Sequence, residues 1–527
     1  MATVPQVMHK RSDVVIRPIR LTTIVAAALL VLTNALAQPG SDLRVAVSRD
    51  VECWNPLEGP CGASIQYHDL ILDTLVRWDA DLNLEPRLAL SWEALDDFTW
   101  EFVLRQGVTF TNGEPFDADA VLFMFDAILN PEGREAPATM QASYRPVERI
   151  DVIDDYTVRF ITSEPYPLLP RYMAYEPRAV APAYYQDVGM DEFGARPIGT
   201  GPYTLGEWVR GDRFVLDPNP DYWGGVPENG SRLVFRPLPE DTTRVAELLT
   251  GGVEIAEFVP GDLVGLVEAS AIARPVTVPG LRCIYINLRP EDRLPNQALR
   301  EAFFLATNHD EIVNDLLGGY ADALEQGNCV TPFEFGYDAA IEPWPFDVEL
   351  ARQKVAESGY QGEEIELYWP EGLVAQIDQV AEVLQAQWAR AGLNVSLNRM
   401  EYGLWRQNWS ARTVPGDIFI GGSASKALDS DARLIPSVHC RDTELGFGRV
   451  SFYCNPEIDP LIQEARVTVD EEARQAMYSQ VWSTHRDDAH HLTLFSPRVV
   501  YGMSNDLEWQ PGIEGHWGLI IDALWVD

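Results

Sequence analysis

Basic residues are scarce in this sequence. The chain of 527 residues has 40 lysines and arginines against 80 aspartates and glutamates, which gives a formal net charge of −40 at pH 7. An excess of negative charge repels phosphate backbones and anionic lipid headgroups, so we expect neither nucleic acid nor an anionic membrane surface to be a partner. The acidity is typical of a well-solvated surface and does not identify a ligand.

Long apolar runs are absent after the N-terminus, since nothing later approaches the ~20 apolar residues of a membrane-spanning helix. Basic residues up to Arg20 precede the apolar stretch 21–36, and Ala35-Leu36-Ala37 is a suitable cleavage site. We therefore expect residues 1–37 to be a signal peptide that is cleaved after Ala37, with a periplasmic mature protein. Cleavage removes four positive charges and one negative charge, so the mature chain carries −43. No cysteine lies at the cleavage point, so a lipid anchor is not expected.

Only six cysteines are present, and export makes them candidates for disulfides. Cys440 and Cys454 close a short Gly-containing segment, which a disulfide would stabilise by about 3 kcal/mol. Cys53 and Cys61 are close enough in sequence for a second loop, which leaves Cys283 with Cys329. Six cysteines allow about fifteen connectivities, so the pairing beyond the first disulfide stays open.

Metal-ligating patterns are also missing, because no C-x-x-C pair or Cys/His group has ligand spacing. The nearest group is His485 with Asp487, Asp488, His490 and His491. Adjacent residues such as His490 and His491 point to different faces in regular structure. We therefore expect no metal site and no cofactor.

The stretch from Arg196 to Gly225, RPIGTGPYTLGEWVRGDRFVLDPNPDYWGG, contains closely spaced glycines and prolines. Gly199, Gly201 and Pro202 predict a turn in which φ is positive or fixed, followed by a hairpin of two short strands. A phosphate-binding loop would need a helix behind it, whereas here a proline and a strand follow. The stretch is therefore interpreted as structural.

Other segments give a consistent α/β order. LALSWEALDDFTWEFVLRQGVTF predicts a hairpin, and a helix begins at Ala118 with Asp117 as a helix cap. Strands at 364–369 and 393–399 flank a helix over 374–391, which predicts a parallel pair with a right-handed crossover.

Five ordered segments carry a resemblance to the family 5 solute-binding proteins, the extracytoplasmic receptors of peptide/nickel-type ABC importers. They are the two quoted above, the L-x-x-G-x-V-E-I form ending at Ile255, the helix pair after Asn296, and the N-P-E-x-D start at Asn455. The resemblance covers nearly the whole mature chain. It implies a two-lobed α/β fold of the periplasmic-binding-protein type, with two crossing strands and an enlarged first lobe.

The resemblance also implies domain limits. The first lobe is expected to comprise residues 38–287 and 496–527, including an extra subdomain at about 86–195. The second lobe is expected to comprise residues 288–495. A ligand would bind between the lobes and favour their closed form.

The resemblance further places the ligand-binding residues. Trp405 matches the family's ligand-contacting aromatic, with Tyr402 one turn earlier, whereas Trp409 is interpreted as core. Glu58 and Phe125 fall near positions that line the cleft in peptide receptors. The loop after the strand at 414–421 supplies the remaining candidates, which are Ser423, Ala424, Ser425, Lys426 and Asp429.

This loop departs from the family pattern. Peptide receptors carry a W-x-A-D-Y-x-D-P-like segment here, whose first aspartate pairs with the α-amine of the peptide. In this sequence the aromatic becomes Ser423 and the acid becomes Lys426. A cation in that place suits a carboxylate, a phosphate or another anionic group. A slip in the alignment would instead bring Asp429 to the anchoring position, and that alternative stays open.

The predicted function is a non-enzymatic receptor that captures a small peptide-like or anionic solute and delivers it to an ABC permease in the inner membrane. The receptor is expected to act as a monomer. One alternative is an exported hydrolase that uses Ser423, since a strand enters Gly421-Gly-Ser-Ala-Ser425, although a nucleophile elbow requires glycine where Ser425 stands. Another alternative is a sensory or chaperone-like binding protein on the same fold.

Overall fold

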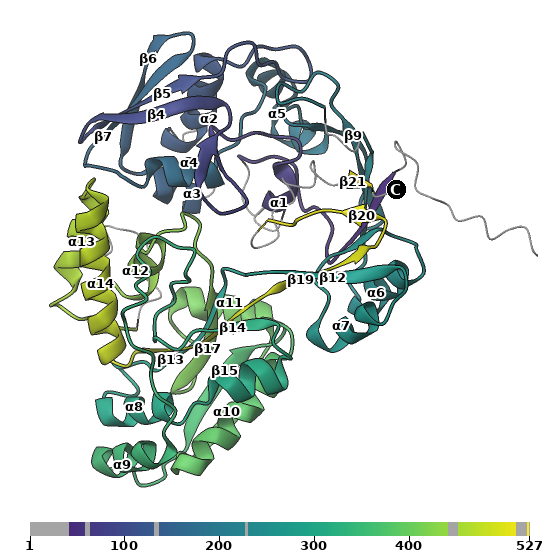
Figure 1. Cartoon of the computed structure of the whole chain (residues 1–527). Helices are drawn as coiled ribbons and strands as arrows, with labels where there is room; N and C mark the ends of the chain where they lie inside the picture. The colour runs from purple at the N-terminus through teal and green to yellow at the C-terminus, as the bar shows by residue number, and fades with distance from the viewer. Residues whose placement is uncertain are drawn as a thin grey trace, which may run out of the picture.

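The protein folds into two lobes, each built around its own mixed β-sheet (Figure 1). The computed structural model describes residues 42–57, 64–130, 136, 138–226, 230–440, 452–512 and 524–525. The signal peptide predicted at 1–37 lies outside these residues. The predicted α/β, two-lobed architecture is confirmed. Within the described ranges, no helix combines the length and apolar character needed to cross a membrane.

The first lobe contains a seven-stranded sheet with the order β12-β19-β11-β1-β10-β9-β8. Its strands are β1 (Leu43–Val47), β8 (Tyr203–Val209), β9 (Arg213–Pro218), β10 (Leu233–Pro237), β11 (Ile255–Ala256), β12 (Ala273–Val278) and β19 (Val499–Ser504). Strand β1 pairs in parallel with both β10 and β11, whereas β8 and β9 form the predicted antiparallel hairpin.

A four-stranded antiparallel sheet forms the outer part of the first lobe, in the order β4-β5-β7-β6. Its strands are β4 (Ala89–Asp96), β5 (Thr99–Leu104), β6 (Val147–Asp154) and β7 (Thr157–Thr162). Helix α2 (Ala118–Leu129) packs on this sheet, and Asp117 caps it as predicted by accepting from the N–H groups of Asp119 and Ala120. Two short strand pairs complete the described strands of this half: β2 (Val76–Trp78) with β3 (Leu84–Pro86), and β20 (Leu507–Glu508) with β21 (Leu524–Trp525).

The second lobe is built on a six-stranded sheet with the order β14-β18-β13-β17-β15-β16. Its strands are β13 (Cys283–Asn287), β14 (Ala321–Ala323), β15 (Ile365–Pro370), β16 (Val395–Met400), β17 (Ile418–Ser423) and β18 (His491–Pro497). Strands β15 and β16 are parallel and are joined by α10 (Ile377–Ala391), which confirms the predicted crossover unit.

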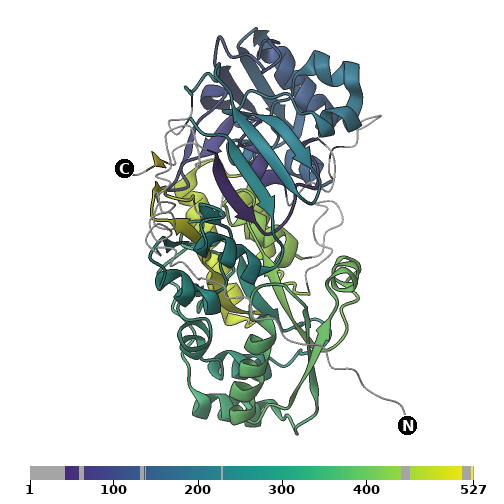
Figure 2. The same ribbon diagram turned by 90° about the vertical axis from the view of Figure 1, so that its right-hand side faces the viewer.

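Helices cover both lobes. Those of the first lobe, besides α2, are α1 (Ile65–His68), α3 (Ala138–Tyr144), α4 (Leu169–Tyr175), α5 (Pro182–Ala195), α6 (Asp241–Leu249) and α7 (Gly261–Glu268). Those of the second lobe, besides α10, are α8 (Gln297–Leu305), the π-helix Glu311–Leu316, α9 (Val348–Ser358), α11 (Tyr402–Ala411), α12 (Asp431–Ser437), α13 (Asp459–Val467) and α14 (Glu471–Asp487). In Figure 1, α10 lies against the second-lobe sheet and α13 and α14 stand side by side at the left of that lobe, while Figure 2 shows the two lobes one above the other.

The chain passes between the lobes at two short connections. Strand β12 belongs to the first sheet and β13 to the second, and β18 and β19 make the reverse passage with Arg498 between them. These crossings lie within a few residues of the predicted domain limits at 287/288 and 495/496. The limits themselves stay predictions.

Two of the three expected disulfides lie within the described residues. Cys283 at the start of β13 bonds to Cys329 with a Cα–Cα distance of 5.4 Å, and Cys440 bonds to Cys454 with a Cα–Cα distance of 4.4 Å. Cys61 lies outside the described residues, so the pairing of Cys53 with Cys61 stays a prediction.

The turn at Gly199 and Gly201 owes its glycines to a close approach of two backbone segments. Neither residue has a positive φ, so the predicted reason for these glycines was wrong. A Cβ on Gly199 would lie 2.1 Å from the carbonyl oxygen of Ile71, and one on Gly201 would lie 2.5 Å from its carbonyl carbon. The N–H of Gly201 donates to that oxygen at 2.9 Å. The turn therefore fixes the α1–β2 loop to the first sheet.

Replacement of Gly201 by alanine is expected to lower the free energy of unfolding by about 1–3 kcal/mol, because the new methyl group forces these backbones apart. Gly265 on α7 is a matched control, since a Cβ there meets nothing within 4 Å. Alanine at Gly265 should stabilise the protein by about 0.5–1 kcal/mol through helix propensity. Urea unfolding of the two variants measures both effects, and equal stabilities would contradict the close-approach argument.

Candidate functional site

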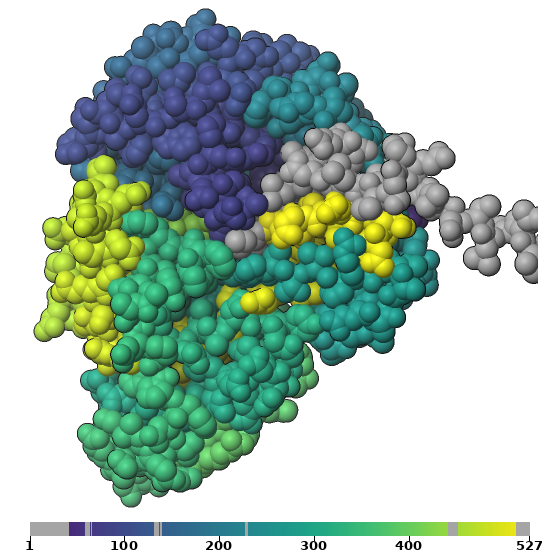
Figure 3. Space-filling model, viewed as in Figure 1, coloured from purple at the N-terminus to yellow at the C-terminus, as the bar shows by residue number. Residues whose placement is uncertain are grey.

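The loop that follows β17 meets the first lobe directly. Ala427 has no exposed surface and packs within the core of the outer first-lobe sheet. Arg171 of α4 reaches the same loop, since its Nη1 donates to the carbonyl oxygen of Leu428 at 3.2 Å. The space-filling view shows residues of the two lobes in contact on the side that it draws (Figure 3). The loop that contains Lys426 therefore lies where the two lobes meet.

Lys426 forms a contact between the lobes. Its Nζ lies 3.3 Å from Oε1 of Glu176 and 5.2 Å from the ring centroid of Tyr175, both in the first lobe. The Lys426 side chain keeps 35% of its surface exposed, whereas the carboxylate of Glu176 is buried. The ammonium group is thus held at the junction, on a side chain that is partly exposed.

Asp429 has a different environment. Its carboxylate accepts hydrogen bonds from Arg474 at 2.9 Å and from the hydroxyl of Tyr478 at 3.0 Å, and it has no exposed surface. Nε of Arg171 lies 3.7 Å away. Asp429 is therefore engaged by cations of the protein itself, and the alternative in which it anchors the ligand is not supported.

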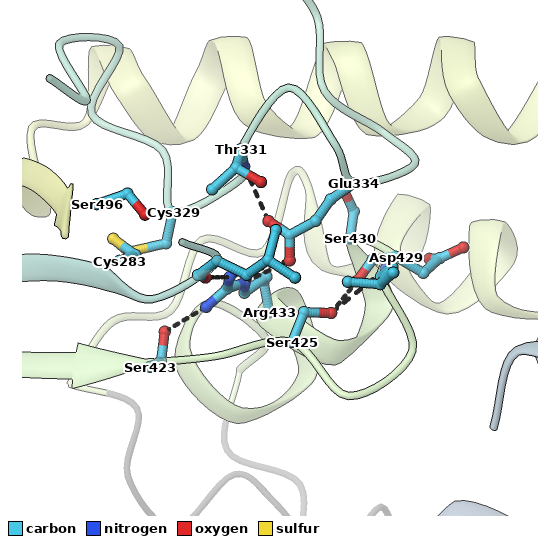
Figure 4. A network of polar contacts seen from close by, with 12 residues as sticks. Cys283, Cys329, Thr331, Glu334, Ser423, Ser425, Asp429, Ser430, Arg433 and Ser496 are labelled. Carbon is cyan, nitrogen blue, oxygen red and sulfur yellow. Dashed lines mark hydrogen bonds and ion pairs between the residues drawn. A yellow bond between two sulfur atoms is a disulfide. The ribbon is translucent and has the colours of Figure 1, made fainter. Parts of the chain in front are cut away.

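Ser423 ends β17, Ala424 and Ser425 begin the loop that follows, and Figure 4 shows the polar network around Ser423 and Ser425. The hydroxyl of Ser423 accepts a hydrogen bond from Nη1 of Arg433 at 2.8 Å, and Ser425 Oγ accepts from the N–H of Asp429 at 3.3 Å. Arg433 also donates to Glu334 at 3.0 Å, which fixes the loop to the second lobe. Because a guanidinium has no lone pair that could take a proton, Arg433 cannot activate Ser423 as a nucleophile.

Burial shapes the protonation of the acids around this loop. Desolvation raises the pKa of Asp431, although the cation of Arg466 opposes the shift. Desolvation likewise raises the pKa of Glu334 against the effect of Arg433. The interior below the loop thus disfavours unpaired negative charge.

A small cavity of about 60 Å³ lies in the first lobe beside this junction. Tyr175 belongs to its wall and also faces Lys426. Charged pairs line it, since Arg178 lies 2.7 Å from Asp69, and Arg87 lies 2.5 Å from Asp73. The cavity therefore extends the polar junction into the first lobe.

The other predicted ligand contacts lie elsewhere. Phe125 is fully buried and packs edge-on against Tyr144 and Phe160, so it belongs to the core and was wrongly placed at the cleft. Trp405 is 5% exposed and packs against Phe419, so the structure supports a core role for it as well. Tyr402 is exposed, and Glu58 lies outside the described residues.

The absence of a metal site was predicted on an incorrect premise. The ring nitrogens of His485, His490 and His491 lie within 4.8 Å of one another, so the two adjacent histidines do not point apart. Ala489 has a positive φ of 49° and His490 precedes β18, so regular strand geometry does not apply to this pair.

Sequence reasoning missed the first-lobe side of the junction. Arg171, Tyr175 and Glu176 lie some 250 residues before the loop that they contact. The segment Tyr172-Met-Ala-Tyr-Glu-Pro177 carries no motif, and the buried Glu176 marks it only in the structure.

Known binding proteins are similar to this chain in sequence. The glutathione-binding protein GsiB of Pectobacterium atrosepticum is 26% identical over 441 residues, covering 82% of this chain and 84% of that protein. GsiB of Salmonella typhi is 25% identical over 496 residues, covering 91% and 94%. These relatives are solute-binding proteins, and none of the names given includes a catalytic activity.

Solved structures show the same fold. The ABC transporter substrate-binding protein CtaP of Listeria monocytogenes superposes with a TM-score of 0.83 at 21% identity, covering 93% of this chain and all of that one. NikA of Brucella suis, solved with Fe(III)-EDTA, gives 0.80 at 22% identity, covering 91% and 99%.

The family model for bacterial extracellular solute-binding proteins, family 5 middle, matches residues 83–444, which is more than half of the chain. The protein therefore belongs to family 5 of the bacterial extracellular solute-binding proteins, the non-enzymatic substrate-binding receptors of ABC importers.

Proposed function

We propose that this receptor binds an anionic, peptide-like solute between its lobes and that Lys426 is the cationic anchor. The observation that carries the proposal is the position of the Lys426 ammonium at the lobe junction, partly exposed and beside an aromatic ring. An ammonium there complements a carboxylate. Glutathione, which relatives of this chain are named for binding, is a tripeptide with an anionic net charge at neutral pH.

The contacts between the lobes support a closure mechanism. Lys426 meets Glu176 and Arg171 meets the Asp429 loop, so each lobe offers a charge of opposite sign to the other. A solute carboxylate would join the Lys426 ammonium and add an attraction that exists only when the lobes are closed. Such a differential interaction is what shifts the equilibrium toward the closed state, and we propose that this state delivers the solute to the permease.

We further propose that Ser423, Ala424 and Ser425 line the solute site next to Lys426, with Tyr402 and Glu58 at its margins. The mature protein is proposed to be a periplasmic monomer that begins after Ala37. The periplasmic location is supported by solved relatives such as the periplasmic binding protein DppA of Helicobacter pylori. The charge of the mature chain supports the absence of a nucleic-acid partner.

Replacement of Lys426 by alanine is expected to weaken the binding of glutathione or of a co-purified anionic solute by about 10- to 100-fold, because a hydrogen bond to a charged group contributes about 1.5–3 kcal/mol. Native mass spectrometry of the purified protein identifies a co-purified solute, and titration calorimetry measures both affinities. Lys354 on α9, which pairs with Glu301, is the control lysine, and its alanine variant should bind like the wild type. If the Lys426 variant binds the solute as tightly as the wild type does, Lys426 is not the anchor. Because both proteins would still bind the solute, the receptor function would stand.

A further inference from the structure

Three histidines converge inside the second lobe, away from the loop that contains Lys426. His485 lies in the last turn of α14, His490 follows the bend at Ala489, and His491 opens β18. The rings of His490 and His491 are stacked with centroids 3.9 Å apart, and the ring of His485 lies 5.3 Å from each of them. The bend thus folds the end of a helix and the start of a strand around one point.

The cluster is buried and its hydrogen bonding is incomplete. His485 and His490 have no exposed surface, and His491 has 2%. Nε2 of His485 and Nδ1 of His490 share one hydrogen bond of 3.1 Å, while Nε2 of His490 has no partner. Nδ1 of His485 also makes no hydrogen bond of normal geometry, although the backbone of Gly327 lies near it.

Neither arrangement of the shared proton satisfies this pair. If His485 donates, the Nε2–H group of His490 is buried without an acceptor. If His490 donates, its Nε2 lone pair is buried without a donor. A buried polar atom left unsatisfied costs about 1–3 kcal/mol, so such an atom calls for a partner.

The third ring already presents a lone pair. The amide nitrogen of Asn287 lies 3.3 Å from Nε2 of His491, and the amide oxygen of Asn287 accepts from the N–H of Arg289 at 3.0 Å. This second contact orients the amide, so its nitrogen donates toward His491. His491 is therefore a neutral imidazole whose Nε2 lone pair accepts from Asn287, and metal binding would exchange that hydrogen bond for the ion.

We propose that His485, His490 and His491 together bind one divalent first-row transition-metal ion, with Zn²⁺ as the preferred occupant. Neutral imidazole nitrogens are ligands for zinc, copper and nickel, whereas calcium and magnesium require oxygen ligands. Zinc–nitrogen distances of about 2.0–2.1 Å correspond to nitrogen separations of about 3.3 Å in a tetrahedron. The nitrogens, now within 4.8 Å of one another, need to approach by about 1.5 Å at most, and the stacked rings of His490 and His491 need to turn so that both lone pairs point at the ion.

Because the cluster is enclosed, the ion enters as the lobe folds and then ties α14 to β18, the strand that leads into the second crossing.

The test is to unfold the full mature chain in denaturant with a chelator and to refold it with Zn²⁺ or Co²⁺, followed by removal of loosely bound ion. We expect about one ion per chain by elemental mass spectrometry. X-ray absorption of the zinc form should show nitrogen neighbours at about 2.0 Å with imidazole scattering. The Co²⁺ form should show visible absorption bands.

Two variants separate this site from others. His490→Ala should reduce the metal content at least about tenfold. His309→Gln changes a buried histidine that bonds Thr493 outside the cluster, and it should retain about one ion per chain, as should Lys426→Ala in the other site. Fewer than about 0.1 ions per refolded wild-type chain, or unchanged metal content in His490→Ala, would overturn the proposal. If His490→Ala does not refold, the X-ray absorption spectrum of the zinc-loaded wild type provides the test. A spectrum without scattering from imidazole neighbours would overturn the proposal.

Discussion

Replacement of Arg474 by methionine is expected to lower the free energy of unfolding by about 3–5 kcal/mol, because it leaves the carboxylate of Asp429 buried without its main cation. Nη2 of Arg474 donates to Asp429 at 2.9 Å and both side chains are inaccessible to solvent. Although burial opposes the charged guanidinium, Asp429 raises the pKa of Arg474 above its ordinary value. Urea unfolding monitored by circular dichroism measures the loss.

A double variant identifies the cause. Changing Asp429 to asparagine in the Arg474→Met background removes the buried charge and should restore part of the lost stability. Arg399 provides an exposed control, since it pairs with Asp378 at 3.0 Å where both side chains contact solvent. Its methionine variant should change stability by no more than about 0.5–1 kcal/mol. A loss below about 1 kcal/mol in Arg474→Met would indicate that Arg171 alone can hold Asp429.

Features encoded by neighbouring residues were predictable from the sequence. Asp117 occupies a cap position directly before an apolar helix, and the β15–α10–β16 unit follows from alternation and helical spacing within forty residues. The hairpin of β8 and β9 has the same origin. Such patterns act through local backbone geometry, so they can be interpreted without knowing the rest of the fold.

Features that depend on distant segments were not predictable. The partner of Lys426 is Glu176, and only the meeting of the lobes brings them within 3.3 Å. Phe125 was assigned to the cleft from its place in the sequence, but the helix face that it occupies turns toward the four-stranded sheet. The convergence of His490 and His491 depends on a single positive φ at Ala489, an alanine that gives no turn signal.

Acidification from pH 7 to pH 4 is expected to remove about 3 kcal/mol of stability through His68 alone. This histidine ends α1, is buried, and has its Nε2 3.0 Å from the carbonyl oxygen of Cys53. Burial lowers its pKa from 6.5 to about 4, assisted by the nearby cation of Arg178. Between these two values the unfolded chain binds a proton that the folded protein excludes. The stabilisation is therefore complete above about pH 6.5 and is lost as the pH falls toward 4.

The effect of His68 is isolated by comparing pH dependence rather than stability at one pH. Glutamine at position 68 can still donate to Cys53 but does not titrate, so the His68→Gln variant should lose about 2 kcal/mol less than the wild type between pH 7 and pH 5. Asp431 and Glu334 act in the opposite direction, since their raised pKa values make acid favour the folded state, but they are the same in both proteins. Their contribution cancels in the difference between the two curves. Parallel curves would mean that His68 is protonated in the folded protein despite its burial, with its charge held by Asp69 beside it.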